Sequence, residues 1–188
     1  HPGRKQLKYW TALGLLRGVM SSPAAGVMML RNRIKNLPDA NEDFMDETNP
    51  ILDEDYSGDR DFVPEHVMGK NDWTRSQREK LDELANELEG LGNIEDDWKA
   101  SYTLEIIKEW LKEGFNPVIF CRYIPTAKYL GEVLSAEIKK AFSKAQVLVI
   151  TSEDPDEVRK QRIESLDQKT PRVMFATDCL SGGINLQE

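Results

Sequence analysis

Three short apolar runs in the second half of the chain restrict its fold more than any other feature of the sequence. They cover residues 118–121, 147–150 and 173–176. Each run is too short for a helix, and it lacks the alternating polar residues of a strand with one solvent-exposed face. We therefore expect parallel strands buried on both faces. Helical patterns fill residues 125–142 and 155–166 between them, at the spacing of β-α-β units. The sequence therefore predicts an α/β fold built on an open parallel sheet.

The first part of the chain has a helical pattern. Apolar residues recur at three- and four-residue spacing from Arg4 to Met20 and again after Pro23, which predicts two helices, each with one buried face. Ser22 stands before this proline, as an N-cap residue does before a first-turn proline. We expect these two helices to form a hairpin.

Two later helices carry further signals. One is expected to follow a capping-box pattern from Ser76, and the next is expected to end at Gly114 with an apolar stripe of Trp98, Tyr102, Ile106 and Trp110. Within the sheet region, Asp154 followed by Pro155 predicts an N-cap and a first-turn proline for the helix that follows.

Charge is divided unevenly along the chain. Residues 1–35 hold seven Lys or Arg and no acids, whereas residues 39–66 hold eleven acids and a single base, Arg60. One insert therefore accounts for most of the net charge of −8. Because phosphate binding depends on local charge, the basic arm is compatible with nucleic acid. The same distribution of charge fits equally well two differently solvated surfaces without a ligand.

The composition excludes several classes of protein. No apolar run approaches the roughly 20 residues that span a bilayer, so no membrane segment is expected. Cys121 and Cys179 have no cysteine or histidine at ligand spacing, which argues against zinc and disulfides and favours a cytoplasmic protein. His1 and His66 lie in segments that we expect to be mobile, so neither a metal site nor a Ser/His/Asp triad can be assembled. A Gly-x-x-x-x-Gly-Lys-Ser/Thr loop is also absent from the sequence.

Polar residues follow each of the three expected strands. They are Arg122 and Tyr123 after the first, Thr151 and Ser152 after the second, and Thr177 and Asp178 with Gly182 and Gly183 after the third. The carboxyl ends of parallel strands meet at one edge of a sheet, where α/β proteins bind ligands. Hydroxyl, N–H and guanidinium groups suit phosphate oxygens. From the residues alone, the glycine pair fits either phosphate binding or a simple tight turn.

These segments resemble the C-terminal lobe of superfamily 2 helicases. Residues 118–123, with Thr126, Tyr129 and Leu130, resemble motif IV, and residues 176–187 resemble motif V. The stretch 151–162 is similar to the segment that joins those motifs. The ending Gly-Ile-Asn-Leu-Gln resembles bacterial Swi/Snf-like DNA helicases and translocases; DEAD-box RNA helicases normally carry an acid at the position of Asn185.

The resemblance implies an incomplete RecA-like lobe with an N-terminal helical extension, belonging to an ATP-driven DNA motor. It implies that the DNA phosphate backbone is contacted by Arg122, Tyr123, Thr151, Ser152 and Thr177. It also implies that the ATP cleft is lined by Gly182, Gly183, Asn185 and Gln187. The phosphate-binding lysine, the magnesium-binding acids and the arginine finger of such motors lie outside this chain. ATP and Mg²⁺ are therefore expected for the intact parent, whereas the fragment should bind neither and be inactive alone.

The sequence patterns and the resemblance together predict four parts of the chain. Residues 1–36 form a helical hairpin that leads to the missing N-terminal motor lobe of the same polypeptide, and residues 37–73 form an acidic, mobile insert that suits a partner protein. Residues 74–114 form a helical segment, and residues 115–188 form the truncated RecA-like lobe.

Two other functions remain open from the sequence. One is a noncatalytic protein-interaction module that uses the basic hairpin or the acidic insert. The other is a nucleotide-sugar transferase-like lobe with a doubly wound sheet, although no donor-site motif supports it.

Overall fold

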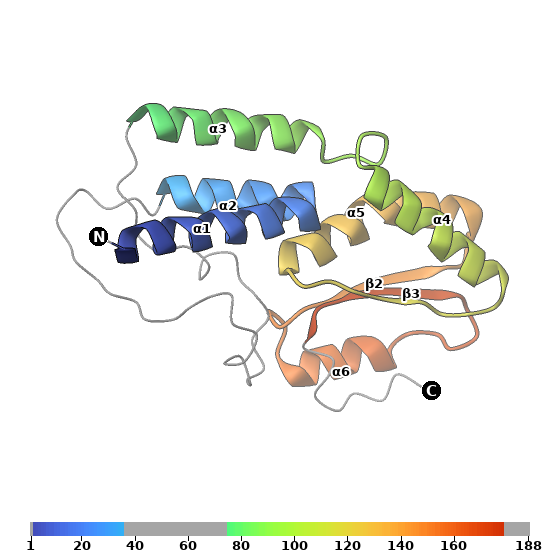
Figure 1. Ribbon diagram of the computed structural model, residues 1–188. Helices are drawn as coiled ribbons and strands as arrows, with labels where there is room; N and C mark the ends of the chain where they lie inside the picture. The colour runs from blue at the N-terminus through green and yellow to red at the C-terminus, as the bar shows by residue number, and fades with distance from the viewer. Residues whose placement is uncertain (1, 36–74, 179–188) are drawn as a thin grey trace. The chain divides into compact units, whose positions relative to one another are not determined.

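The computed structural model describes residues 2–35 and 75–178, which fall into two compact units. Within these residues, no helix combines the length and apolarity required to cross a bilayer. The first unit contains α1 (Pro2–Ser21), α2 (Pro23–Lys35) and α3 (Arg75–Gly90). The second contains α4 (Trp98–Lys112), β1 (Val118–Phe120), α5 (Ile124–Ala141), β2 (Gln146–Ile150), α6 (Asp156–Glu164) and β3 (Arg172–Ala176) (Figure 1).

The first unit is built around the break between α1 and α2. Ser22 lies between α1 and α2 and caps α2 as the sequence predicted, because its Oγ accepts a hydrogen bond of 3.1 Å from the N–H of Ala25. The two helices approach so closely that a Cβ on Gly18 would lie 2.1 Å from the Sδ of Met29. Leu30 of α2 forms a small core with Leu81 and Ala85 of α3. The helices of segment 74–114 therefore belong to different units: α3 packs on α2 in the first unit, and α4 is part of the second unit.

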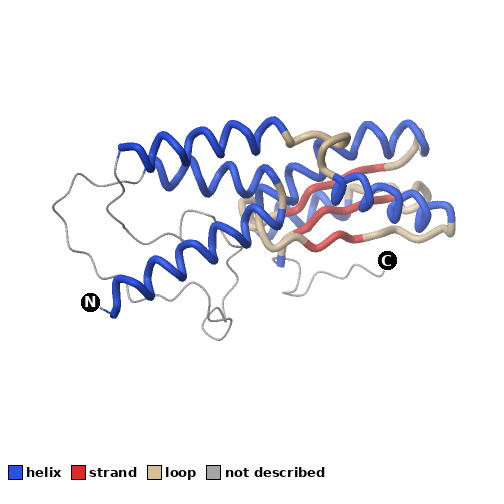
Figure 2. The backbone as a smooth tube through the Cα atoms, turned by 45° about the horizontal axis from the view of Figure 1, so that its top comes forward, coloured by secondary structure: helices blue, strands red, loops and turns tan. Residues whose placement is uncertain are grey.

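The second unit contains the parallel sheet that the sequence predicted. Its order is β1-β3-β2, and both neighbouring pairs are parallel. Figure 2 shows the strands of the sheet side by side in red. The expectation that every strand is buried on both faces is correct for β3, in which residues 173–176 are all buried. It is wrong for β1 and β2, most of whose residues are partly exposed, because each has a single neighbour within the described sheet.

The connections between the strands place helices on both faces of the sheet. The chain passes from β1 to β2 through α5 and returns from β2 to the central β3 through α6. Because β-α-β crossovers are right-handed, this reversal of direction requires α5 and α6 on opposite faces, as Figure 1 shows. Ile163 and Leu166 cover Ile150, Met174 and Ala176 on the α6 face. The result is an open α/β sheet with flanking helices and an additional set of N-terminal helices.

Helix α4 has two apolar stripes, and it buries the smaller one. Ala100, Leu104, Ile107 and Leu111 are buried. By contrast, Trp98 and Tyr102 of the stripe noted in the sequence are 76% and 63% exposed. The carboxylate of Asp97 fixes the start of the helix by accepting hydrogen bonds of 3.0 Å from the N–H groups of Lys99 and Ala100. It also accepts a hydrogen bond of 3.0 Å from the hydroxyl of Tyr129, which links α4 to α5.

Gly131 provides a test of how closely α5 packs on the sheet. A Cβ at this position would lie 2.2 Å from the Cγ2 of Val149, a side chain that is stiff because it is β-branched. For Gly131→Ala, overpacking costs about 1–3 kcal/mol, whereas the gain in helix propensity is about 1 kcal/mol. We therefore predict a lower free energy of unfolding, measured by urea denaturation.

The control for this prediction is Val149→Ala, which removes the obstructing methyl groups. In that background, adding Gly131→Ala should no longer destabilise the chain. Gly90→Ala offers a second comparison, since a Cβ there meets no atom within 4 Å. An increase in stability for Gly131→Ala in the unaltered chain would contradict the close packing of α5 on β2.

Cys121 provides a second test, because it follows β1 directly and is only 5% exposed. Burial raises the pKa of its thiol to about 11, although the nearby charge of Lys99 acts in the opposite direction. At pH 8 about one thiol in a thousand is then the reactive thiolate. We predict that Cys121 in a Cys179→Ser variant reacts slowly with a disulfide reagent until denaturant is added. Labelling as fast as that of the unfolded chain would contradict this burial.

Candidate nucleic-acid interface

The carboxyl ends of the three strands lie level with one another. Phe120 and Ile150, the last residues of β1 and β2, both pair with Ala176, the last residue of β3. The backbone ladder continues beyond the strands, since the N–H of Cys121 donates to the oxygen of Ala176 at 2.7 Å. The N–H of Thr177 likewise donates to the oxygen of Ile150 at 3.2 Å. The three following loops therefore leave the sheet side by side. We call this edge the carboxyl rim and define it as residues 121–123, 151–155 and 177–178.

The loop after β1 exposes an arginine and buries a tyrosine. Arg122 is exposed, whereas Tyr123 is only 3% exposed. Tyr123 lies at the N-cap of α5, where its carbonyl oxygen accepts from the N–H groups of Thr126 and Ala127 at 3.0 and 3.2 Å. Of the two residues that the sequence selected here, Arg122 presents its side chain at the surface, whereas Tyr123 supports the helix start.

The loop after β2 is shaped by internal hydrogen bonds. Thr151 is 4% exposed, and its Oγ1 accepts from the N–H of Glu153 at 3.4 Å and donates to Glu153 Oε2 at 3.5 Å. Ser152 is partly exposed. The expectation that Asp154 caps α6 is wrong, because Pro155 occupies the N-cap position and no side chain caps the helix. The carboxylate of Asp154 instead pairs with the guanidinium of Arg162.

The loop after β3 is described only as far as Asp178. Thr177 is completely buried at the centre of the carboxyl rim, and Asp178 is exposed. The four residues expected at the ATP cleft lie outside the described residues, as does Cys179. They are Gly182, Gly183, Asn185 and Gln187.

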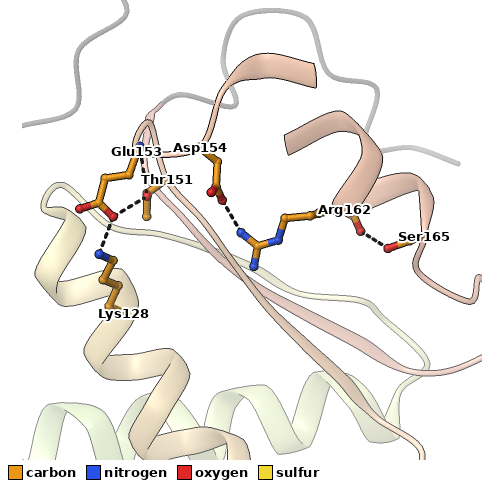
Figure 3. Close-up of polar contacts among 6 residues, drawn as sticks. All are labelled: Lys128, Thr151, Glu153, Asp154, Arg162 and Ser165. Atoms are coloured by element: carbon orange, nitrogen blue, oxygen red, sulfur yellow. Dashed lines mark hydrogen bonds and ion pairs between the residues drawn. The ribbon is translucent and has the colours of Figure 1, made fainter. Parts of the chain in front are cut away.

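Ion pairs join the second loop to the helices on both faces of the sheet. Lys128 of α5 pairs with Glu153, and Arg162 of α6 pairs with Asp154 (Figure 3). The sequence patterns did not select Lys128, although its place one turn into α5 puts it close to the expected rim. Arg159 of α6 is also nearly buried and pairs with Asp156 in the first turn of its own helix. Charge of both signs is thus concentrated around the loop.

The chemistry available at the carboxyl rim is recognition by charge and hydrogen bonds. Within the described ranges 2–35 and 75–178, no group of three or more His, Cys, Asp or Glu side chains could hold a metal ion. A guanidinium, hydroxyls and an ammonium group suit oxyanions such as phosphate. The described residues of the rim therefore suit the binding of an oxyanion.

Comparison with known proteins agrees with this geometry. The family model of the helicase conserved C-terminal domain matches residues 98–188, which run from the start of α4 through all three strands. Searches of the curated proteins and of the solved structures found no match. The matched region contains the whole carboxyl rim and all the segments that carry the resemblance noted in the sequence. Residues 98–188 of this chain therefore match the helicase conserved C-terminal domain.

Proposed function

We propose that the chain is the second motor lobe of an ATP-dependent DNA helicase or translocase of the bacterial Swi/Snf-like type. The single observation that carries this proposal is the level ending of three parallel strands, which brings Arg122, Thr151 and Thr177 to one rim. The helicase domain match over the same strands supports it. The Swi/Snf-like assignment and the choice of DNA depend on the motif V ending at Asn185.

Burial divides the proposed DNA-binding residues into two groups. Arg122 is exposed and Ser152 partly so, and we assign them direct contact with phosphate oxygens. Tyr123, Thr151 and Thr177 are at most 4% exposed. Their proposed role is to hold the three loops in the arrangement that a DNA strand would follow.

The nucleotide belongs, in this proposal, to the cleft between two lobes. Gly182, Gly183, Asn185 and Gln187 would face ATP from this side. The N-terminal lobe of the same polypeptide would supply the phosphate-binding lysine and the acids that hold Mg²⁺. Bound ATP would provide the free energy for the two lobes to close on DNA. Residues 1–36 would connect to that lobe, and the acidic segment 37–73 would remain available to a partner protein in the cytoplasm.

The first prediction from this function concerns catalysis. The chain alone should release no phosphate from ATP above the blank, with or without DNA. The reason is that its sequence has no phosphate-binding Gly-Lys loop and lacks the groups that neutralise charge in phosphoryl transfer. DNA-stimulated hydrolysis by the purified chain would contradict the proposal. An Arg122→Ala preparation run in parallel detects a contaminating ATPase, because such activity would not depend on Arg122.

The second prediction concerns DNA binding, measured by fluorescence anisotropy with a short labelled duplex. We expect weak binding that falls steeply with salt, because phosphate contacts release counterions. Arg122→Ala should weaken binding and lower the salt slope by about 1. Lys144→Ala is the matched control, since Lys144 is an exposed cation in the turn before β2, at the other edge of the sheet.

Two results would contradict DNA binding at the carboxyl rim. One is equal affinity at low and high salt. The other is equal loss of binding for Arg122→Ala and Lys144→Ala. A protein-interaction module predicts that Arg122 and Thr177 can both be replaced by alanine without any change in DNA binding.

A further inference from the structure

The loop after β2 presents two consecutive carboxylates, each paired with a cation from a different helix. Glu153 pairs with Lys128 of α5, and Asp154 pairs with Arg162 of α6. Figure 3 shows both pairs reaching the loop, with Thr151 beside Glu153. Because α5 and α6 cover opposite faces of the sheet, the two cations approach the carboxyl rim from both sides.

Stability alone gives little reason for these pairs. The side chains of Lys128 and Glu153 are 56% and 52% exposed, and those of Arg162 and Asp154 are 40% and 33% exposed. Ion pairs that are this exposed contribute little to folding, because water and salt screen them. For the same reason they can separate at little cost when another anion arrives.

The chemistry of the pairs points to such an anion. Arginine binds carboxylates and phosphates through the same planar array of N–H donors, and lysine binds either as a compact charge. A carboxylate on a loop can therefore occupy the position that a phosphate would take. Both carboxylates stand within three residues of Thr151, in the loop to which we assign DNA contact.

We propose that Lys128 and Arg162 are phosphate-binding residues. In the absence of nucleic acid, the ammonium group of Lys128 is paired with Glu153 and the guanidinium of Arg162 with Asp154. This inference rests on the proposed function of the carboxyl rim. When a DNA strand binds, its phosphates replace the two carboxylates as partners of the two cations. The carboxylates keep both side chains directed at the rim and lower the affinity of the lobe for DNA, because each exchange breaks an ion pair.

The test compares neutral variants of nearly the same shape in the anisotropy assay. Glu153→Gln and Asp154→Asn should each tighten DNA binding by about two- to fivefold, the size of one exposed ion pair. Lys128→Met and Arg162→Met should each weaken binding and lower the salt slope by about 1. In the double variant Glu153→Gln/Lys128→Met, the gain from removing the carboxylate should disappear, because the cation that it releases is absent.

The matched control is the exposed pair of Lys160 and Glu164 on α6, whose charged atoms lie 3.8 Å apart. Glu164→Gln and Lys160→Met change the net charge by the same amounts as Glu153→Gln and Lys128→Met. A gain for Glu153→Gln no larger than that for Glu164→Gln would overturn the inference. So would a gain that persists in the Lys128→Met background.

The design separates failure of this inference from failure of the proposed function. If the unaltered chain binds DNA through Arg122 but is indifferent to all four side chains, only the exchange of ion pairs is wrong. If neither the unaltered chain nor any variant binds DNA, the proposed function itself is contradicted and the inference falls with it. Urea denaturation of each variant checks that the changes in affinity do not arise from unfolding.

Discussion

The register of the three parallel strands determines where the loops of the carboxyl rim lie and how the helices reach them. Phe120, Ala176 and Ile150 end their strands at one level, and backbone hydrogen bonds continue through Cys121 and Thr177 just beyond. A slip of one residue would turn the side chains of a strand to the opposite face. It would also move one loop out of line with the other two. The common position of Arg122, Ser152 and Asp178 therefore follows from the ladder.

The helices on the two faces of the sheet bring charged side chains to the carboxyl rim. Gly131 allows α5 to lie close to Val149, and Ile163 holds α6 against the opposite face of the sheet. Lys128 and Arg162 consequently reach the same loop from two faces. The apolar packing contributes to the stability of the unit, whereas the exposed ion pairs contribute little to it. The polar surface can therefore adapt to an anion without loosening the core.

Much of the fold could be predicted from the sequence, because its signals are local. Continuous apolar runs identified the three parallel strands, and Ser22 before Pro23 identified the start of α2. Other features depend on tertiary contacts that no local pattern records. Asp154 has the residue type and position of an N-cap, yet its carboxylate forms an ion pair with the guanidinium of Arg162. Helix α4 could have buried either stripe, and it buries the one with the smaller side chains, Ala100, Leu104, Ile107 and Leu111.

The site could be predicted less completely than the fold. The sequence located the three loops correctly, because parallel strands of similar length must end at a common edge. It did not show that Tyr123, Thr151 and Thr177 are buried, since burial depends on the neighbouring loops. It also did not select Lys128, because a lysine one turn into a helix is usually a solvated residue. The strands thus predicted the position of the carboxyl rim, whereas the structure was required to show which of its side chains are exposed.

Hydrogen–deuterium exchange of the chain, with and without a short DNA duplex, shows whether nucleic acid binds at the carboxyl rim. If the carboxyl rim binds nucleic acid, DNA should slow exchange together in residues 121–123, 151–155 and 177–178. The turns at the opposite edge of the sheet, residues 113–117, 142–145 and 165–171, should exchange at unchanged rates. Protection at that opposite edge, or in only one of the three loops, would contradict the account.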